Sequence, residues 1–319
     1  MSATDNLQES IRAGFGRGLL KAAQEDKNVV VLTADLAEST NVGDFRDEFP
    51  ERFIDVGVAE QNLVTVGSGM AKMGKVPFVS SYAAFCPGRC WEQIRTTICL
   101  NDMNVKIIGA HAGLGTSPDG ATHQALEDIA LMRVLPNMQV FAPADSVEAE
   151  KITLAVAKTK SPSYIRLTRP DVPVFTNPNH EFKIGEGARI KAGQDVTILS
   201  TGTATWHALE AGIKLKDHGI DAEVLHFPTI KPLDEDLILE SAKRTGLFVT
   251  VEDHQVAGGF GSAVSEFLSE NLPIPLVRVG VENKFGQSGT PDELFRLYGI
   301  TSTNIVKKAV ELIKKHTTK

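Results

Sequence analysis

Carboxylate or imidazole side chains follow three short apolar runs in the first half of the sequence. Asp35, Glu60 and His111 each come soon after the end of such a run. In an open parallel sheet the carboxyl ends of the strands meet at one edge, and ligands bind there. If the runs are parallel strands, these three side chains share one edge and form a candidate ligand site.

Glu60 stands at the start of a glycine-rich apolar stretch, residues 63–74, which is expected to be helical. An apolar surrounding favours the neutral form of a buried carboxyl group. A neutral Glu60 could donate a proton to a ligand nitrogen. Alternatively, this glutamate only benefits from the positive end of the helix dipole in the first turn. The residues alone leave both interpretations open.

Turn-forming residues fill the segment 113–124, which is expected to lead into a helix. Asp119 and His123 could share one face if that helix begins early, and both could then reach a small polar ligand. In the alternative interpretation, Asp119 is a turn residue and Thr122 caps the helix. We favour a ligand-binding role because His111 is close in the sequence.

Arginine side chains at three positions could hold a phosphate group, because the guanidinium fork matches its geometry. These are Arg12, Arg89 and Arg169, and each could equally be a solvated surface residue. The sequence contains no P-loop and no nucleophile elbow, which argues against a kinase or a hydrolase. The glycines at 258–261 are followed by Val264 where a dinucleotide fingerprint has Gly or Ala, so they predict close helix packing instead.

The alternation of apolar runs and helical patterns predicts an α/β fold of two domains, each a mostly parallel sheet flanked by helices. We expect the first domain at 1–172, a linker at 173–192 and the second domain at 193–319. Strands are expected at 29–32, 53–56, 76–79, 105–108, 138–141, 164–167, 196–199, 222–225, 247–251 and 276–279, and helices at 63–74, 125–132, 204–216 and 304–314.

The composition, 42% hydrophobic and 23% charged over 319 residues, is typical of a folded globular protein. The net charge is -7 and basic residues are interspersed with acidic ones, so neither nucleic acid nor a membrane is an expected partner. Cys86, Cys90 and Cys99 lack CxxC spacing, which favours buried reduced thiols and no metal site. Neither a signal peptide nor an apolar run of roughly 18 residues is present, so we expect a cytoplasmic protein.

Five segments, in their order along the chain, resemble the pyrimidine-binding domain of transketolases. The ordered set is specific, although one segment alone would be a weak signal. The resemblance covers nearly the whole chain, because the residues after the expected linker resemble the C-terminal domain of the same family. The segments are Ala34–Leu36, Val58–Asn62, the pair Tyr82 and Phe85, His111–Gly115 and Asp119–Gln124.

The resemblance implies thiamine diphosphate as the cofactor. Glu60 would pass a proton to the aminopyrimidine ring of that cofactor, and an apolar pocket would keep this carboxyl group protonated. Phe85 would stack on the ring, which is worth about 0.5 to 1.5 kcal/mol beyond area burial, and Tyr82 would line the same pocket. Asp35 and Leu36 complete the implied cofactor-binding set. The alternative for the two aromatic residues is an ordinary place in the core.

The resemblance also implies a substrate site for phosphorylated sugars. Asp119 and His123 would bind hydroxyl groups of a ketose, and catalysis would involve His111 and His123 together with Glu60. Several charge-assisted bonds to a sugar phosphate would orient the reacting carbonyl group. The remaining substrate-binding residues in this interpretation are Arg12, Ser39, Arg89, His111 and Arg169.

Two positions depart from the family pattern and leave the donor and acceptor sugars open. Pro118 replaces an acidic residue that commonly precedes the Asp-Gly pair, and Gly88 replaces a tyrosine of full-length enzymes. Nothing before Glu60 is long enough to supply the family's amino-terminal domain, which holds the diphosphate and its Mg²⁺ or Ca²⁺.

We therefore expect the C-terminal subunit of a split transketolase, active only with a partner subunit that carries the amino-terminal domain, in a two-plus-two assembly. The expected reaction, in the pentose phosphate pathway, moves a two-carbon ketol unit from a ketose phosphate to an aldose phosphate. Two alternatives remain open: half of a 1-deoxy-D-xylulose-5-phosphate synthase-like enzyme, and a non-catalytic regulatory subunit of the same fold.

Overall fold

The larger of the two main sheets is built almost entirely from the first half of the chain. The computed structural model describes residues 7–317. The strands of this sheet are β2 (Val29–Thr33), β3 (Phe53–Asp55), β4 (Val76–Tyr82), β5 (Lys106–Ala110), β6 (Gln139–Phe141), β7 (Ser163–Arg166) and β12 (Thr229–Lys231). Their spatial order is β12-β6-β7-β5-β4-β2-β3, and all neighbours are parallel except β12 and β6.

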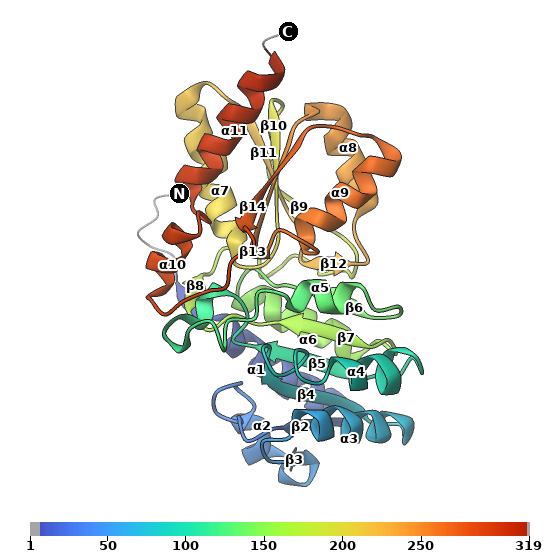
Figure 1. Cartoon of the computed structure of the whole chain (residues 1–319). Helices are drawn as coiled ribbons and strands as arrows, with labels where there is room; N and C mark the ends of the chain where they lie inside the picture. The colour runs from blue at the N-terminus through green and yellow to red at the C-terminus, as the bar shows by residue number, and fades with distance from the viewer. Residues whose placement is uncertain (1–6, 318–319) are drawn as a thin grey trace.

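The second main sheet belongs to the C-terminal half and lies above the first in Figure 1. Its spatial order is β14-β13-β10-β11-β9, with only β9 antiparallel to its neighbour. A short ribbon of β1 (Gln8–Ser10) and β8 (Asp171–Pro173) is separate from both sheets. The strands of the second sheet are β9 (Ala188–Lys191), β10 (Val196–Ser200), β11 (Ala222–His226), β13 (Phe248–Gln255) and β14 (Leu276–Val281).

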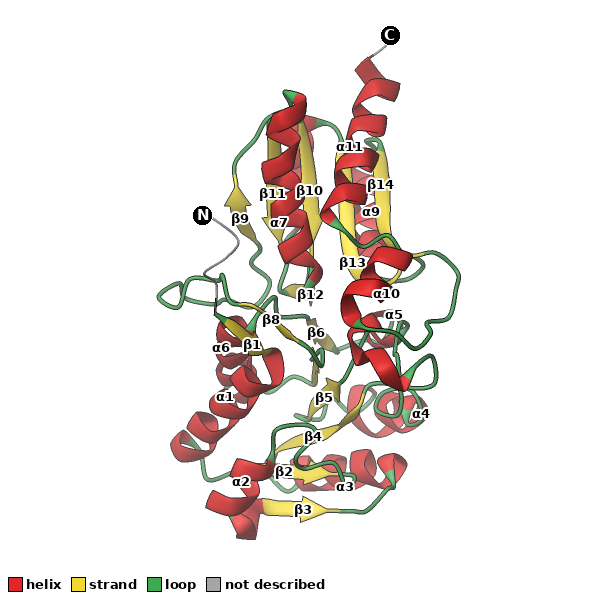
Figure 2. Cartoon of the chain, turned by 90° about the vertical axis from the view of Figure 1, so that its left-hand side faces the viewer, coloured by secondary structure: helices red, strands yellow, loops and turns green. Residues whose placement is uncertain are grey.

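Helices cover both faces of each main sheet, as Figures 1 and 2 show. This confirms the predicted α/β fold of mostly parallel sheets flanked by helices. The α-helices are α1 (Ile11–Glu25), α2 (Gly43–Glu48), α3 (Glu60–Lys72), α4 (Trp91–Gln93), α5 (Asp128–Arg133), α6 (Ser146–Ala157), α7 (Ala204–Lys214), α8 (Glu235–Thr245), α9 (Phe260–Asn271), α10 (Pro291–Leu297) and α11 (Ser302–Thr317). The shorter or irregular turns are η1 (Pro50–Arg52), η2 (Ile94–Cys99), η3 (Leu114–Asp119) and η4 (Leu215–His218).

The burial of β2 shows why its sequence is continuously apolar. Successive side chains of a strand point to opposite faces, and both faces of this strand are covered. Val29 and Val31 pack in one core cluster with residues of α1 and α6, whereas Val30 and Leu32 pack in another with residues of α3. The second of these clusters continues into the C-terminal half, where α8 and α9 join it. The two domains therefore share a hydrophobic core.

All the expected strands are present. The structure differs from the sequence-based expectations at β12, which lies in the expected second domain but joins the larger sheet, and in two further places. Strand β9 lies inside the segment 173–192 that was expected to be a linker, and it pairs with β11. The helix expected at 125–132 begins only at Asp128. The carbonyl group of Ala125 accepts a hydrogen bond from the N–H group of Gly113, and Ala125 forms an isolated β-bridge with Ala112, so this residue is extended and not helical.

Three further expectations concern buried groups and membranes. The three cysteines are buried and free, as predicted, and burial raises the pKa of Cys99 to about 11. The predicted close packing near Val264 is confirmed, because a Cβ atom on Gly261 would lie 2.5 Å from Thr250 Oγ1. Among the helices of residues 7–317, none combines the length and the apolar character needed to cross a bilayer.

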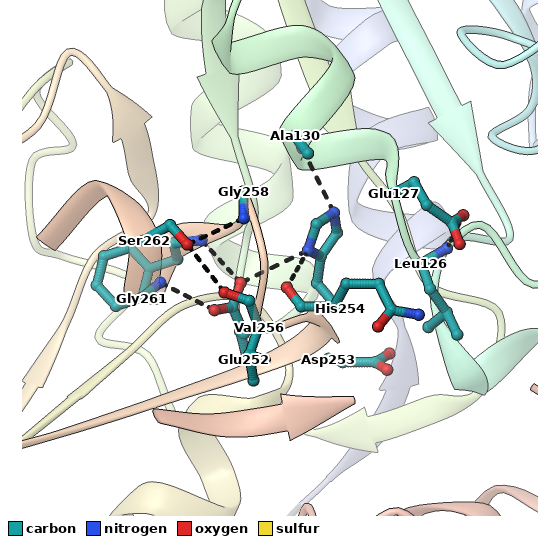
Figure 3. Close-up of polar contacts among 12 residues, drawn as sticks. Leu126, Glu127, Ala130, Glu252, Asp253, His254, Val256, Gly258, Gly261 and Ser262 are labelled. Atoms are coloured by element: carbon teal, nitrogen blue, oxygen red, sulfur yellow. Dashed lines mark hydrogen bonds and ion pairs between the residues drawn. The ribbon is translucent and has the colours of Figure 1, made fainter. Parts of the chain in front are cut away.

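Near its end strand β13 has three buried ionisable residues, and two of them, Asp253 and His254, connect the two domains (Figure 3). The carboxylate of Asp253 accepts the N–H group of Leu114 at 3.0 Å, and Nε2 of His254 accepts that of Ala130 at 3.4 Å. Burial lowers the pKa of His254 to about 4, so this imidazole is neutral and can accept. Glu252 accepts the first N–H groups of α9, and burial raises its pKa to about 7. The C-terminal sheet thereby fixes η3 and α5 of the first domain.

Asp145 connects helix α6 to the segment between the domains. Its side chain is fully buried and caps α6 by accepting the N–H group of Glu148 at 3.0 Å. The same carboxylate accepts the N–H groups of Phe175 and Thr176 at 2.8 and 2.7 Å, and the Thr176 hydroxyl group at 2.7 Å. One buried carboxylate therefore satisfies several backbone donors.

The substitution Asp145→Ala is expected to lower the free energy of unfolding by about 3 kcal/mol, because buried N–H groups lose their acceptor. Urea unfolding followed by circular dichroism measures this change. The matched control is Asp47→Ala, at an exposed aspartate, which should change the free energy by less than about 0.5 kcal/mol. Equal effects of the two substitutions would contradict the capping role.

Candidate cofactor and substrate site

Glu60 is the first residue of α3, directly after the N-cap Ala59, at the carboxyl-end edge of the larger sheet. Its side chain is 2% exposed. Oε2 accepts a bond from NH1 of Arg89 at 2.8 Å, and Oε1 accepts the hydroxyl group of Ser81 at 3.4 Å. The burial of Glu60 matches the expectation. The prediction that its surroundings are apolar is wrong, because Arg89 supplies an opposite charge.

Four rings form an aromatic cluster beside this carboxylate. Tyr82 stacks with Phe85 at 6.3 Å between centroids and lies 4.2 Å from the ring of His111. The ring of His123 meets Phe85 edge-on at 5.3 Å, and its Nδ1 forms a 2.9 Å hydrogen bond with the hydroxyl group of Thr122. The structure thus brings together the aromatic and imidazole residues that the sequence singled out.

His111 and Arg12 form a second cluster with Ser39 and Arg169. NH1 of Arg12 lies 3.1 Å from Nε2 of His111 and donates to the carbonyl oxygen of Ser39 at 2.6 Å, while NH2 donates to the carbonyl oxygen of Arg169 at 3.1 Å. Burial, and then the charges of Arg12 and Arg169, lower the pKa of His111 to about 3. The imidazole is therefore neutral, and its Nε2 accepts because a guanidinium group can only donate.

Asp119 joins this cluster from the end of η3. Its carboxylate lies 3.2 Å from NH1 of Arg169, which also donates to the carbonyl oxygen of Thr116 at 3.3 Å. The side chains of Asp119 and Arg169 are 32% and 40% exposed, so both are open to a ligand. The pair places a carboxylate and a guanidinium group together at one edge of the sheet.

The second domain holds the segment 117–124 in place. The Ser117 hydroxyl group donates to the carbonyl oxygen of Gly289 at 2.8 Å, and the Gln124 amide donates to that of Gln287 at 3.0 Å. Gly120 has φ +75°, and a Cβ atom there would lie 2.8 Å from the Ser288 hydroxyl oxygen. No local pattern in the sequence signals these contacts, because they join residues that are far apart along the chain.

Asp35 and Leu36 follow β2 at the same edge of the sheet. The N–H group of Asp35 donates to the carboxylate of Asp55 at 3.0 Å, and that of Leu36 donates to the hydroxyl group of Thr33 at 3.3 Å. In the described part of the chain, these contacts include none of the other predicted site residues. Their place in a cofactor site stays a prediction.

Two cavities lie at opposite ends of the larger sheet. The smaller, of about 200 Å³, is beside the aromatic cluster and is lined by Ala84, Gly88, Thr122 and Phe285 among others. The larger, of about 660 Å³, is at the amino ends of the strands, near Val76. The smaller cavity is at the carboxyl ends of the strands, where ligands of open parallel sheets bind, but its lining includes neither Glu60 nor Phe85 nor His111.

The space between Glu60 and Phe85 fits a flat group that carries hydrogen-bond donors. Arg89 demonstrates the fit: its guanidinium carbon lies 4.7 Å from the Phe85 centroid while its NH1 donates to the carboxylate. An aminopyrimidine ring needs the same two contacts. Within residues 7–317, no group of three or more His, Cys, Asp or Glu side chains is placed to hold a metal ion.

Comparisons with known proteins identify the family of this chain. The transketolase pyrimidine-binding domain matches residues 8–174, and the transketolase C-terminal domain matches residues 185–305. The 6-deoxy-6-sulfo-D-fructose transketolase subunit of Clostridium sp. (strain MSTE9) is 41% identical over 297 residues, which are 93% of this chain and 92% of that protein. A subunit of the apulose-4-phosphate transketolase of Phocaeicola vulgatus is 37% identical over 311 residues, 97% of this chain and 99% of its own.

A solved structure described as a split gene transketolase, inactive beta4 tetramer, has the same fold. It superposes with a TM-score of 0.90 at 47% identity, and the match covers 96% of this chain and 98% of that one. The chain belongs to the transketolase family, and its halves are the pyrimidine-binding and C-terminal domains of that family. The resemblance found in the sequence is thus confirmed.

The His111 imidazole is expected to remain neutral at pH 5, because its pKa is lowered to about 3. The substitution Arg12→Met should raise this pKa by removing a positive neighbour, although burial will still keep it below the ordinary value near 6.5. Imidazole ¹⁵N NMR spectra across a pH series measure the titration, with a His111→Asn variant to assign the signal. Arg46→Met, at an exposed arginine of α2, is the control and should leave the pKa unchanged. Titration of His111 near 6.5 in the unsubstituted protein would contradict the expectation.

Proposed function

We propose that this chain is the C-terminal subunit of a split, thiamine diphosphate-dependent transketolase that moves a two-carbon ketol unit from a ketose phosphate to an aldose phosphate. The observation that carries the proposal is the carboxyl group of Glu60, 2% exposed and connected through Arg89 to the Phe85 ring at the carboxyl-end edge of the sheet. Family membership supports the cofactor, since the two matched domains are those of transketolases.

Glu60 and Phe85 are the residues that would hold the aminopyrimidine ring. When bound, thiamine diphosphate supplies a carbanion that cleaves and forms the carbon–carbon bond next to a carbonyl group. Glu60 would donate a hydrogen bond and a proton to a ring nitrogen, and Phe85 would orient the ring by stacking. Tyr82 would support Phe85 from behind, because the two rings are already stacked.

The second cluster would bind the sugar phosphate. The Arg12 guanidinium group contacts His111, and the charge of Arg169 acts on the same imidazole. Two positive charges at one edge attract a dianion strongly. His111 is neutral there, so its free ring nitrogen could donate to a phosphate or hydroxyl oxygen. Asp119 and His123 would bind hydroxyl groups of the ketose. Ser39 contributes its backbone to the position of Arg12.

A partner subunit would supply the diphosphate and metal sites. The described residues contain no cluster for a metal ion, and a relative that matches 97% of this chain is itself named as one subunit of a transketolase. The matched solved structure is described as split gene and, as a tetramer, inactive. These points support a two-plus-two assembly in which the partner binds Mg²⁺ or Ca²⁺. Because two relatives are named for different sugars, the use of pentose phosphates remains part of the proposal.

The substitution Glu60→Gln is expected to lower the turnover of the assembled enzyme at least about 100-fold, because the proton donor is lost. Formation of sedoheptulose 7-phosphate from xylulose 5-phosphate and ribose 5-phosphate measures the turnover. Glu92→Gln, at an exposed glutamate of α4, is the matched control and should retain activity. Unchanged turnover in Glu60→Gln would support a non-catalytic subunit, and release of carbon dioxide from pyruvate would support the deoxyxylulose-phosphate synthase alternative.

A further inference from the structure

The guanidinium group of Arg89 lies between the Glu60 carboxylate and the Phe85 ring. Its NH1 nitrogen donates to Glu60 at 2.8 Å, and its central carbon is 4.7 Å from the Phe85 centroid. The Glu60 side chain is 2% exposed, whereas the Arg89 side chain is 49% exposed. The arginine thus reaches in from the surface to a carboxylate that is fixed inside the protein.

These two contacts are the ones that the proposed function assigns to the aminopyrimidine ring of the cofactor. A guanidinium group imitates that ring well, because it is planar, donates hydrogen bonds in its plane and stacks on aromatic faces. The ring and the guanidinium group need the same oxygen atoms of Glu60 and the same aromatic partner. Both cannot occupy this place at once.

The ion pair of Arg89 and Glu60 also has an electrostatic role in the chain without cofactor. A buried carboxylate that lacks a partner is unfavourable because it has lost its hydration, and Arg89 compensates the charge of Glu60. Among the described residues, Glu60 is the one hydrogen-bond partner of the Arg89 side chain. Rotation of an exposed side chain is therefore enough to remove the guanidinium group.

We propose that Arg89 is a displaceable placeholder for the aminopyrimidine ring. It occupies the ring's place when thiamine diphosphate is absent, and it leaves when the cofactor binds. The inference rests on the proposed function of Glu60 and Phe85. Its consequence is that Arg89 competes with the cofactor, so that removing the arginine strengthens cofactor binding.

The test is the dissociation constant of thiamine diphosphate, with Mg²⁺ present, for the complex of this chain with its partner subunit, measured by titration calorimetry. If Arg89 fills the place about 90% of the time, Arg89→Met lowers the apparent dissociation constant about tenfold. The cofactor-free complex should also melt at a lower temperature, because Glu60 is left unpaired, and the cofactor should raise the melting temperature more than in the unsubstituted complex. Arg95→Met, at an exposed arginine of η2, is the matched control and should change neither quantity.

A double-substitution cycle separates the placeholder from other roles of Arg89. In a Glu60→Gln background the arginine has no charge to hold it, so Arg89→Met should have little further effect on cofactor binding. Arg89→Lys, which keeps the charge without the plane, should give an intermediate dissociation constant. Weaker or unchanged cofactor binding in Arg89→Met overturns the placeholder while the proposed function stands. Failure of the unsubstituted complex to bind thiamine diphosphate overturns the proposed function itself.

Discussion

The burial of one carboxyl group at the start of a helix constrains the whole of the first domain. Glu60 lies out of the solvent, so its surroundings must supply an opposite charge or a donor wherever the carboxylate is ionised. Ser81 from the end of β4 and Arg89 from the turn after it provide these groups. The end of β4, the turn after it and the start of α3 must therefore keep fixed positions relative to one another. The parallel pairing of β2 with β4 and with β3 maintains these positions.

The position of η3 in the candidate site depends on both domains. Asp253 at the end of β13 accepts the N–H group of Leu114, and a Cβ atom on Gly113 would collide with the same carboxylate. Arg166 completes the junction, since it pairs with Asp128 at 2.9 Å and donates to the carbonyl oxygen of Asp253 at 2.5 Å. The C-terminal domain thus determines where η3, and with it Asp119, can lie. A binding site at one sheet edge is shaped by a sheet from the other half of the chain.

The strands and the buried carboxyl group could be predicted from the sequence, because both follow from local patterns. Apolar runs identify strands that are covered on both faces, and parallel pairing then places Glu60 and His111 at one edge. The partner of Glu60 could not be predicted, since an arginine next to a glycine resembles any solvated surface residue. The same holds for Ser81 and for the contact of Gln124 with Gln287, which join distant parts of the chain. Strand β9 was missed because its four residues carry little apolar signal.

Strand β12 has a consequence for how this polypeptide could be divided. It comes from the C-terminal half, yet it pairs with β6 and closes one edge of the larger sheet. A fragment that ended at the domain boundary would leave the N–H and C=O groups of β6 without partners along that edge. Open edges of this kind recruit strands from other molecules and promote aggregation. The two halves of this chain are therefore expected to fold as one unit.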